Sequence, residues 1–222
     1  MDGIVYYCRI QTESKEETDA RVGQMLEDGF LKFFQTKFCR ESVKKGRFGK
    51  PFYADGKEMQ FNISHCRGGA AVALSRFPVG VDMECMRKVL PLTVKKCCNG
   101  EETVYVYGKE EARGDEDCLS DTQAERFLKL WTLKESYVKM TGEGLQRPLT
   151  DVCFPQIGAG KRIGQNIWEI DGEKKGQSRH YLSFRDPFIL ALSVNPKDNA
   201  ALLEFEWKEY RFASNGYLET TS

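Results

Sequence analysis

Residues 61–85 have the sequence FNISHCRGGAAVALSRFPVGVDMEC, and this stretch carries most of the information about the fold. Phe61–Ser64 and Ala70–Ser75 are predicted strands, because aromatic, β-branched and small apolar residues alternate there between turn residues. His65–Gly69 between them is predicted to be a loop. Val79–Cys85 follows a proline and predicts a third strand. Three strands therefore follow one another here without an intervening helix.

Helices are predicted on both sides of these strands. Ala20–Phe38 places its apolar residues on one helical face. A second helix begins at Ser120, which forms a capping-box pattern with Gln123, and it ends before Gly142. The charged and irregular segment Leu92–Leu119 is predicted to be a mobile excursion.

Further strands are predicted at Ile4–Ile10, Val152–Ile157, Ile167–Ile170, Tyr181–Phe184, Phe188–Val194 and Leu202–Tyr210. Helices and strands are mixed without a βαβα alternation, and this predicts the α+β class. A boundary near residues 76–78 divides the chain into an N-terminal α+β half, residues 1–77, and a C-terminal half, residues 78–222.

The composition excludes several classes of protein. The 222 residues include 33 Lys+Arg and 33 Asp+Glu, so the net charge is +0, and the mean hydropathy is −0.51. Such a chain is expected to be globular, without a broad charge field that would attract nucleic acid or an anionic membrane. No apolar run reaches the roughly 18 residues of a membrane span, and the N-terminus lacks signal-peptide character. The eight cysteines include no C-x-x-C pair and are expected to be reduced thiols in the cytoplasm.

Two carboxylates lie on one face of the strand Val79–Cys85. Because side chains alternate along a strand, Asp82 and Glu84 point to the same side, and the apolar residues between them point to the other. A solvated outer face is one explanation of this D-x-E pattern. The other is a site for a hard cation such as Mg²⁺, which prefers carboxylate oxygens.

The second predicted helix carries a further charged group within FLKLWTLKESYVK, residues 127–139. Trp131, Glu135 and Lys139 are one turn apart on the same strip, and Lys134 lies beside them. Glu135 and Lys139 form either an ordinary i,i+4 ion pair or part of a site. In the second case Glu135 is a third metal ligand, and the two lysines bind an anionic substrate.

Two other segments have residues suited to binding phosphate. Gly49 allows close approach of the backbone, Pro51 stiffens the chain, and Lys50 offers a positive charge. Ser64 and His65 lie at a strand end and have hydrogen-bond donors, although a single histidine is also a common structural residue. The chain has no G-x-S-x-G motif, which argues against a Ser-His-Asp hydrolase.

A resemblance to a known family is carried by four segments in order: Gly49–Pro51, Phe61–His65, Val79–Glu84 and Phe127–Lys139. Together they resemble the 4′-phosphopantetheinyl transferases of the Sfp type, from about Arg21 to the mid-170s. The resemblance implies a monomer of two similar α+β halves, related by a pseudo-two-fold axis, with the active site in the cleft between them. It also implies transfer of the phosphopantetheine arm of coenzyme A to a serine of an apo acyl- or peptidyl-carrier domain, with release of adenosine 3′,5′-bisphosphate.

The resemblance further implies a role for each candidate residue. Mg²⁺ would be held by Asp82, Glu84 and Glu135, and Glu135 would also accept the serine proton, either directly or through a metal-bound water. Lys139 would neutralise or protonate the leaving group, and Lys134 would hold the diphosphate. The remaining candidates would contact the phosphates and the adenylate end of coenzyme A: Lys50, Ser64, His65 and Arg21.

Two other functions stay open at this stage. One is a module that binds coenzyme A or a carrier domain without turnover, for which loss of a carboxylate would be the sequence support; all three carboxylates are present. The other is a magnesium-dependent nucleotide hydrolase.

Overall fold

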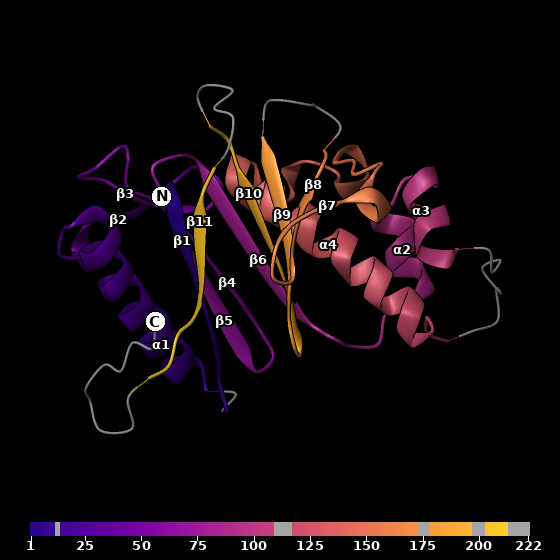
Figure 1. Ribbon diagram of the computed structural model, residues 1–222, viewed down its shortest axis with the longest axis horizontal. Helices are drawn as coiled ribbons and strands as arrows, with labels where there is room; N and C mark the ends of the chain where they lie inside the picture. The colour runs from indigo at the N-terminus through magenta and orange to yellow at the C-terminus, as the bar shows by residue number, and fades with distance from the viewer. Residues whose placement is uncertain (12–13, 109–116, 173–177, 197–202, 213–222) are drawn as a thin grey trace.

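The computed structural model describes residues 1–11, 14–108, 117–172, 178–196 and 203–212. These residues form four layers: helix α1, a four-stranded sheet, a five-stranded sheet, and a helical layer (Figure 1). The helices are α1 (Lys15–Gly29), α2 (Pro91–Cys97), α3 (Gly100–Tyr107) and α4 (Asp121–Thr141). The two sheets pack against each other in the middle of the molecule, and the helices lie in the two outer layers. This combination of helices and strands confirms the α+β class.

The first sheet has the strand order β11-β1-β5-β4. Its strands are β1 (Gly3–Arg9), β4 (Gln60–Cys66), β5 (Gly69–Ser75) and β11 (Phe205–Glu209). Strand β5 is antiparallel to β1 and β4, whereas β11 runs parallel to β1. The last described strand thus joins the sheet of the first half. A single division at residues 77 and 78 therefore does not separate the two sheets, and the predicted boundary is corrected in this respect.

Helix α1 covers the outer face of the first sheet. It begins at Lys15, where Ser14 accepts a hydrogen bond from the Glu17 amide, rather than at Ala20 as predicted. It continues as a π-helical segment to Phe34. The fully buried Phe30 ring contacts four other rings and so forms the centre of this core; they belong to Phe34, Phe38, Tyr53 and Phe61.

The second sheet has the order β6-β10-β9-β8-β7 and is antiparallel throughout. Its strands are β6 (Val79–Cys85), β7 (Lys161–Gly164), β8 (Ile167–Ile170), β9 (Arg179–Arg185) and β10 (Phe188–Val194). The predicted strands at β6, β8 and β10 are confirmed. The predicted strand Val152–Ile157 is wrong, because that segment connects two short 3₁₀ helices, Leu149–Asp151 and Ile157–Ala159.

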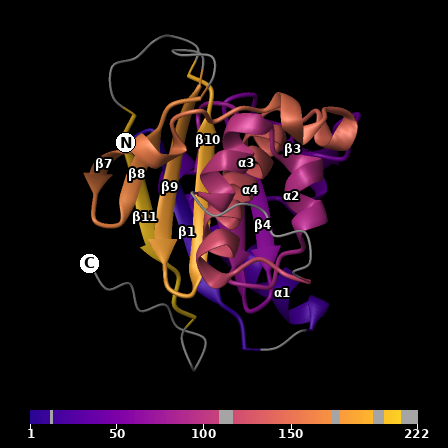
Figure 2. The ribbon, with the colours of Figure 1, turned by 90° about the vertical axis from the view of Figure 1, so that its right-hand side faces the viewer.

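Helix α4 covers the outer face of the second sheet, and α2 and α3 lie beside it (Figure 2). The capping box of Ser120 and Gln123 is present, and Gly142 ends the helix in the left-handed region with φ 74°. Both helix signals are confirmed. The segment Leu92–Leu119 contains most of α2 and all of α3 instead of an irregular excursion, and its residues 109–116 lie outside the described ranges.

The contact between α4 and β6 requires a glycine at position 80. A Cβ atom there would lie 2.0 Å from the carbonyl oxygen of Ser136 and 2.3 Å from the amide nitrogen of Met140. The helix backbone therefore rests directly on the strand. This close approach brings Lys139 of the helix to Asp82 of the strand.

Strands β4 and β6 meet at the seam between the two sheets. The apolar side chains of β6 enter the core between the sheets, as their alternation predicts. Because β6 is an edge strand of its sheet, its outer amides need other partners. Asn62 Oδ1 accepts a hydrogen bond from Val81 N at 2.8 Å, and Ser64 Oγ accepts one from Met83 N at 3.2 Å. Side chains of the first half thus hold the second half in register.

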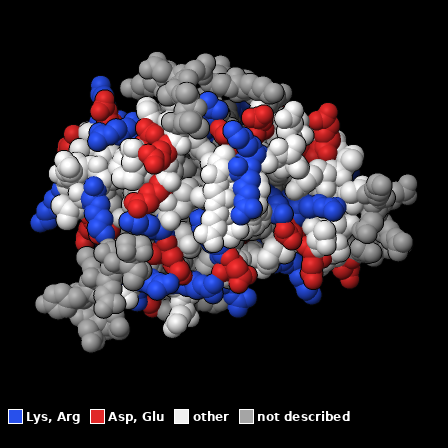
Figure 3. Space-filling view, viewed as in Figure 1, with Lys and Arg blue, Asp and Glu red and all other residues white. Residues whose placement is uncertain are grey.

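A separate hairpin of β2 (Val43–Lys45) and β3 (Pro51–Tyr53) carries the basic segment around Arg47. Acidic and basic side chains are interspersed over the face shown in Figure 3, in keeping with the zero net charge. Across the described residues, no helix combines the length and the apolar character that a membrane span needs.

Candidate functional site

Asp82 lies where the two halves meet and is only 5% exposed. Its Oδ1 accepts hydrogen bonds from Ser64 Oγ at 2.8 Å and from Lys139 Nζ at 2.6 Å. Lys139 Nζ also donates to Ser64 Oγ at 3.0 Å. Strands β4 and β6 and helix α4 thus each contribute one side chain to a single hydrogen-bonded cluster.

The second oxygen of this carboxylate, Asp82 Oδ2, is buried without a hydrogen-bond partner among the described residues. Burial raises the pKa of Asp82, whereas Lys139 and Ser64 lower it and the charge of Glu84 raises it. An unpaired buried carboxylate oxygen is unfavourable unless a ligand or ion uses it. Asp82 Oδ2 is therefore an open acceptor position.

Glu135 and Glu84 lie in the electrostatic field of Asp82. Burial raises the pKa of Glu135; the charge of Asp82 raises it further, Lys139 lowers it, and Glu84 makes a smaller contribution upward. Glu84 Oε2 accepts a hydrogen bond from Arg87 Nε at 3.2 Å. The three predicted carboxylates are thus close enough to repel one another, and a cation would relieve that repulsion.

The chemistry of these donors suits Mg²⁺, because all three are hard oxygen ligands and one oxygen is unpaired. Their side chains do not form a compact ligand group, however. In the described part of the chain, no three His, Cys, Asp or Glu side chains are grouped so that they could hold a metal ion. The predicted three-carboxylate cluster is therefore not preassembled, and Asp82 is paired with Lys139 instead.

A cavity of about 250 Å³ opens beside this cluster. Its lining comes from both halves and includes Phe48, Lys50, Ile63, Glu135 and Lys139. Lys50 Nζ donates to the carbonyl oxygens of Val79 at 3.0 Å and Met140 at 2.9 Å, and burial lowers the pKa of Lys50 to about 8. An ammonium has three protons, so Lys50 retains one for a ligand in the cavity.

Lys134 does not reach this cavity, and its predicted contact with the diphosphate is wrong. It is fully buried, and Nζ donates to Glu102 Oε2 at 2.5 Å and to the carbonyl oxygens of Cys97 at 2.8 Å and Leu149 at 2.9 Å. All three ammonium protons are used. Lys134 lies one position from Glu135 and so projects from a different side of α4, into the core of the second half.

Ser64 and His65 are separated by the alternation of β4. Ser64 is buried beside Asp82, and its hydroxyl proton is donated to that carboxylate rather than offered to the cavity. His65 pairs with Ala70, which faces α1, so His65 lies on the opposite side of the sheet and is exposed. His65 belongs to strand β4, not to the predicted loop.

Arg21 is also on the α1 side of the first sheet. Its Nη2 atom lies 3.3 Å from Glu17 Oε1, and its guanidinium carbon lies 4.1 Å from the centroid of the Phe212 ring.

Two important residues were missed in the sequence. Asn62 lines the cavity and holds β6, and Glu102 neutralises Lys134. Asn62 stands within the segment that carries the family resemblance, but an isolated amide has no distinctive pattern. Glu102 did have a signal, because Asn99 and Glu102 form a capping box at the start of α3.

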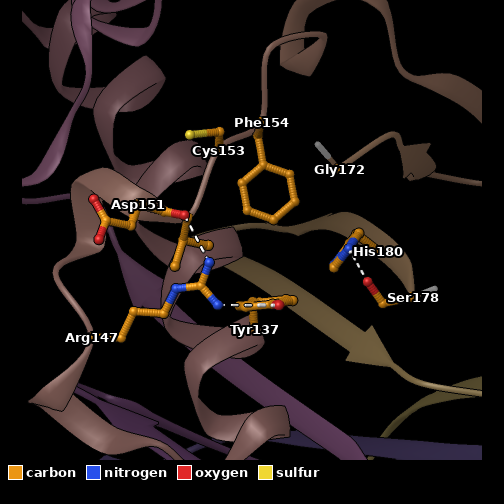
Figure 4. A pocket seen from close by; sticks show the side chains of 9 residues that line it. Tyr137, Arg147, Asp151, Cys153, Phe154, Gly172, Ser178 and His180 are labelled. Carbon is orange, nitrogen blue, oxygen red and sulfur yellow. Dashed lines mark hydrogen bonds between the residues drawn. The ribbon is translucent and has the colours of Figure 1, made fainter. Parts of the chain in front are cut away.

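A second, smaller pocket lies on the other side of α4 (Figure 4). His180 is buried there, with Nε2 hydrogen-bonded to Ser178 Oγ at 2.9 Å and Nδ1 hydrogen-bonded to Ser193 Oγ at 2.8 Å. Ser193 Oγ lies 2.7 Å from Ser136 Oγ on α4. These hydrogen bonds hold α4 at Ser136, the residue next to Glu135. Burial lowers the pKa of His180 to about 4.

Acid should destabilise the protein through His180. The unfolded state binds the proton near the ordinary pKa of 6.5 and the folded state only near 4, so stability present at pH 7 is lost as the pH falls between these values. Going from pH 7 to pH 5 should cost about 2 kcal/mol through this group. Urea unfolding of wild type and His180→Asn at pH 7 and pH 5 checks this. Between the two pH values, the free energy of unfolding of the variant should fall by about 2 kcal/mol less than that of the wild type. Equal losses in the two proteins would contradict it.

Comparison with known proteins concerns the part of the chain that contains β6 and α4. Residues 78–192 match the 4′-phosphopantetheinyl transferase superfamily. The chain is 30% identical over 106 residues to 4′-phosphopantetheinyl transferase gsp of Aneurinibacillus migulanus, and 30% identical over 102 residues to 4′-phosphopantetheinyl transferase Sfp of Bacillus subtilis (strain 168). These alignments cover 48% and 46% of this chain and 40% and 42% of the two relatives. The chain thus matches less than half the length of each relative.

Fold and site together define a protein with an acidic and basic cluster beside a cavity whose lining comes from two α+β halves. The matched segment is about half of the chain and contains Asp82, Glu84, Glu135 and Lys139. The chain therefore belongs to the 4′-phosphopantetheinyl transferase superfamily. The other candidates, Arg21, Lys50, Ser64 and His65, lie before the matched segment.

Proposed function

We propose that this protein transfers the 4′-phosphopantetheine arm of coenzyme A to a serine of an apo acyl- or peptidyl-carrier domain and releases adenosine 3′,5′-bisphosphate. The observation that carries the proposal is the cavity between the halves, in which Glu135, Lys139 and Lys50 face one space beside the buried Asp82. A carboxylate and two ammonium groups that face one space support the roles of a base and two cations, and Glu135 and Lys139 belong to the segment that matches the family.

The reaction forms a bond between the serine oxygen and phosphorus and breaks the diphosphate bond to the leaving adenosine bisphosphate. Glu135 accepts the serine proton, because its raised pKa makes it a better base near neutral pH. Lys139 stabilises the negative charge on the leaving oxygen. Lys50 places its remaining proton toward the phosphates and holds the cavity wall through Val79 and Met140.

The proposal includes Mg²⁺ held by Asp82, Glu84 and Glu135. When bound, the ion would supply positive charge to the diphosphate. The open oxygen of Asp82 and the mutual repulsion of the carboxylates support this assignment. Binding requires Glu84 and Glu135 to turn toward Asp82, and Lys139 to share its contact with that residue.

Replacing Asp82 by Asn should weaken metal binding at least about tenfold, because the variant loses the charge of the central ligand but keeps its shape. Isothermal titration of the full chain with Mg²⁺, without coenzyme A, measures this directly. Glu125→Gln on the exposed side of α4 is the matched control, since Glu125 pairs with Lys129 away from the site. Identical titrations of wild type and Asp82→Asn would remove Asp82 from the ligand set.

Arg21 and His65 are proposed to contact the adenylate end of coenzyme A, His65 through the 3′-phosphate. Both lie on the α1 side of the first sheet, away from Asp82, so they would serve a part of the substrate distant from the reacting phosphate. Ser64 is retained as a residue that positions Asp82. A monomer in the cytoplasm is part of the same proposal.

The test is incubation of the protein with Mg²⁺, coenzyme A and a panel of apo-carrier domains, followed by mass spectrometry. Transfer predicts the phosphopantetheine increment on at least one carrier. Binding of coenzyme A without an increment on any carrier would favour the binding module. Release of adenosine bisphosphate in the absence of a carrier would favour the hydrolase.

A further inference from the structure

Two cysteines end a regular pattern of contacts along the seam between β4 and β6. Asn62 contacts the amide of Val81, and Ser64, two residues on, contacts the amide of Met83. The next step of two residues on each strand pairs Cys66 with Cys85. The register of the seam therefore sets these two thiols against each other.

Both cysteines pack against the apolar core between the sheets. Burial raises the pKa of the Cys66 thiol, and the neighbouring Cys85 raises it further, which agrees with thiols that lie near each other. Both are partly exposed and both are free thiols. The adjacent pair Cys97 and Cys98 is instead buried, so an oxidant in solution has poor access to it.

We propose that Cys66 and Cys85 are an oxidisable dithiol site whose co-substrate is a low-molecular-weight disulfide. One cysteine sulfur attacks the disulfide, whose S–S bond breaks and releases one thiol. The second cysteine sulfur then attacks the mixed disulfide and releases the other thiol. The two cysteines lose two electrons and two protons, and the small disulfide is reduced to two thiols that receive them.

The new bond ties the end of β4 to the end of β6, and so ties the first half to the second beside Glu84. A crosslink between residues 66 and 85 also restricts the unfolded chain. The site stands on the seam geometry alone and does not depend on the proposed transfer activity.

The experiment uses the full chain, reduced and then incubated with oxidised glutathione, with remaining thiols alkylated before digestion and mass spectrometry. The expected result is a crosslinked peptide that contains Cys66 and Cys85, and an increase in Tm of about 5 °C that dithiothreitol reverses. Cys66→Ser and Cys85→Ser should each lose both effects and carry glutathione on the remaining cysteine of the pair.

Cys39 supplies the internal control, because it is exposed and lies far along the chain from the seam. Cys39→Ser should keep the crosslink and the gain in Tm. The proposal is overturned if Cys39 of the wild type becomes glutathionylated while Cys66 and Cys85 stay reduced or carry only separate adducts.

Discussion

Glu135→Gln should slow phosphopantetheine transfer by ~10²-fold or more while leaving the fold intact. The amide is the same size as the carboxylate but accepts no proton and carries no charge. Because burial and the charge of Asp82 raise the pKa of Glu135, the wild-type rate should fall on the acid side at a pH above the ordinary value of 4.5. The base must be unprotonated, so activity is lost as the pH falls through that pKa.

The measurement is kcat and KM with one carrier domain across pH, for wild type and Glu135→Gln. Glu125→Gln on the same helix is the control for loss of a carboxylate from α4 and should behave as wild type. Matching values of Tm would show that the fold is retained. Unchanged turnover in Glu135→Gln would exclude Glu135 from the mechanism.

Lys134→Met should reduce the free energy of unfolding by about 3–5 kcal/mol, the largest stability effect expected in this chain. The substitution leaves Glu102 buried without its cation, together with the carbonyl oxygens of Cys97 and Leu149. Glu102 also accepts hydrogen bonds from the amides of Asn99 and Phe154. Loss of the lysine therefore affects α3, α4 and the loop that follows them.

The double variant Lys134→Met/Glu102→Gln is the matched test of this explanation. It removes both charges and keeps one oxygen acceptor, so one of the two amides retains its partner and the double variant should recover part of the lost stability. Chemical denaturation of wild type, single and double variants measures the effect. If Lys134→Met were as stable as wild type but unable to bind coenzyme A, the predicted contact with the diphosphate would be restored.

The sequence predicted those features that depend on spacing within one element. The alternation in Val79–Cys85 correctly put the carboxylates on one face of β6 and the apolar residues in the core between the sheets. Ser120, Gln123 and Gly142 correctly marked the ends of α4, because caps act over a few residues. Both patterns are local, and no knowledge of neighbouring elements was needed.

Predictions failed where the neighbouring element decided the outcome. Lys134 and Glu135 are adjacent, yet one is enclosed by Glu102 and two carbonyls and the other faces the cavity. Ser64 and His65 are also adjacent, yet the strand directs them to opposite sides of the first sheet. A strand predicted across both residues, in place of a loop at His65, would have separated them.

The sequence by itself determined the class of the fold, the limits of β6 and α4, and the residue types of the site, because each follows from periodicity and capping along a single segment. Only the tertiary structure decided which charged side chains meet. Asp82 joins Lys139 because Gly80 lets α4 lie directly on β6, and the register that the side chains of β4 set along the seam brings Cys66 opposite Cys85. Contacts of this kind depend on how distant segments pack, which the spacing of residues within one segment does not encode.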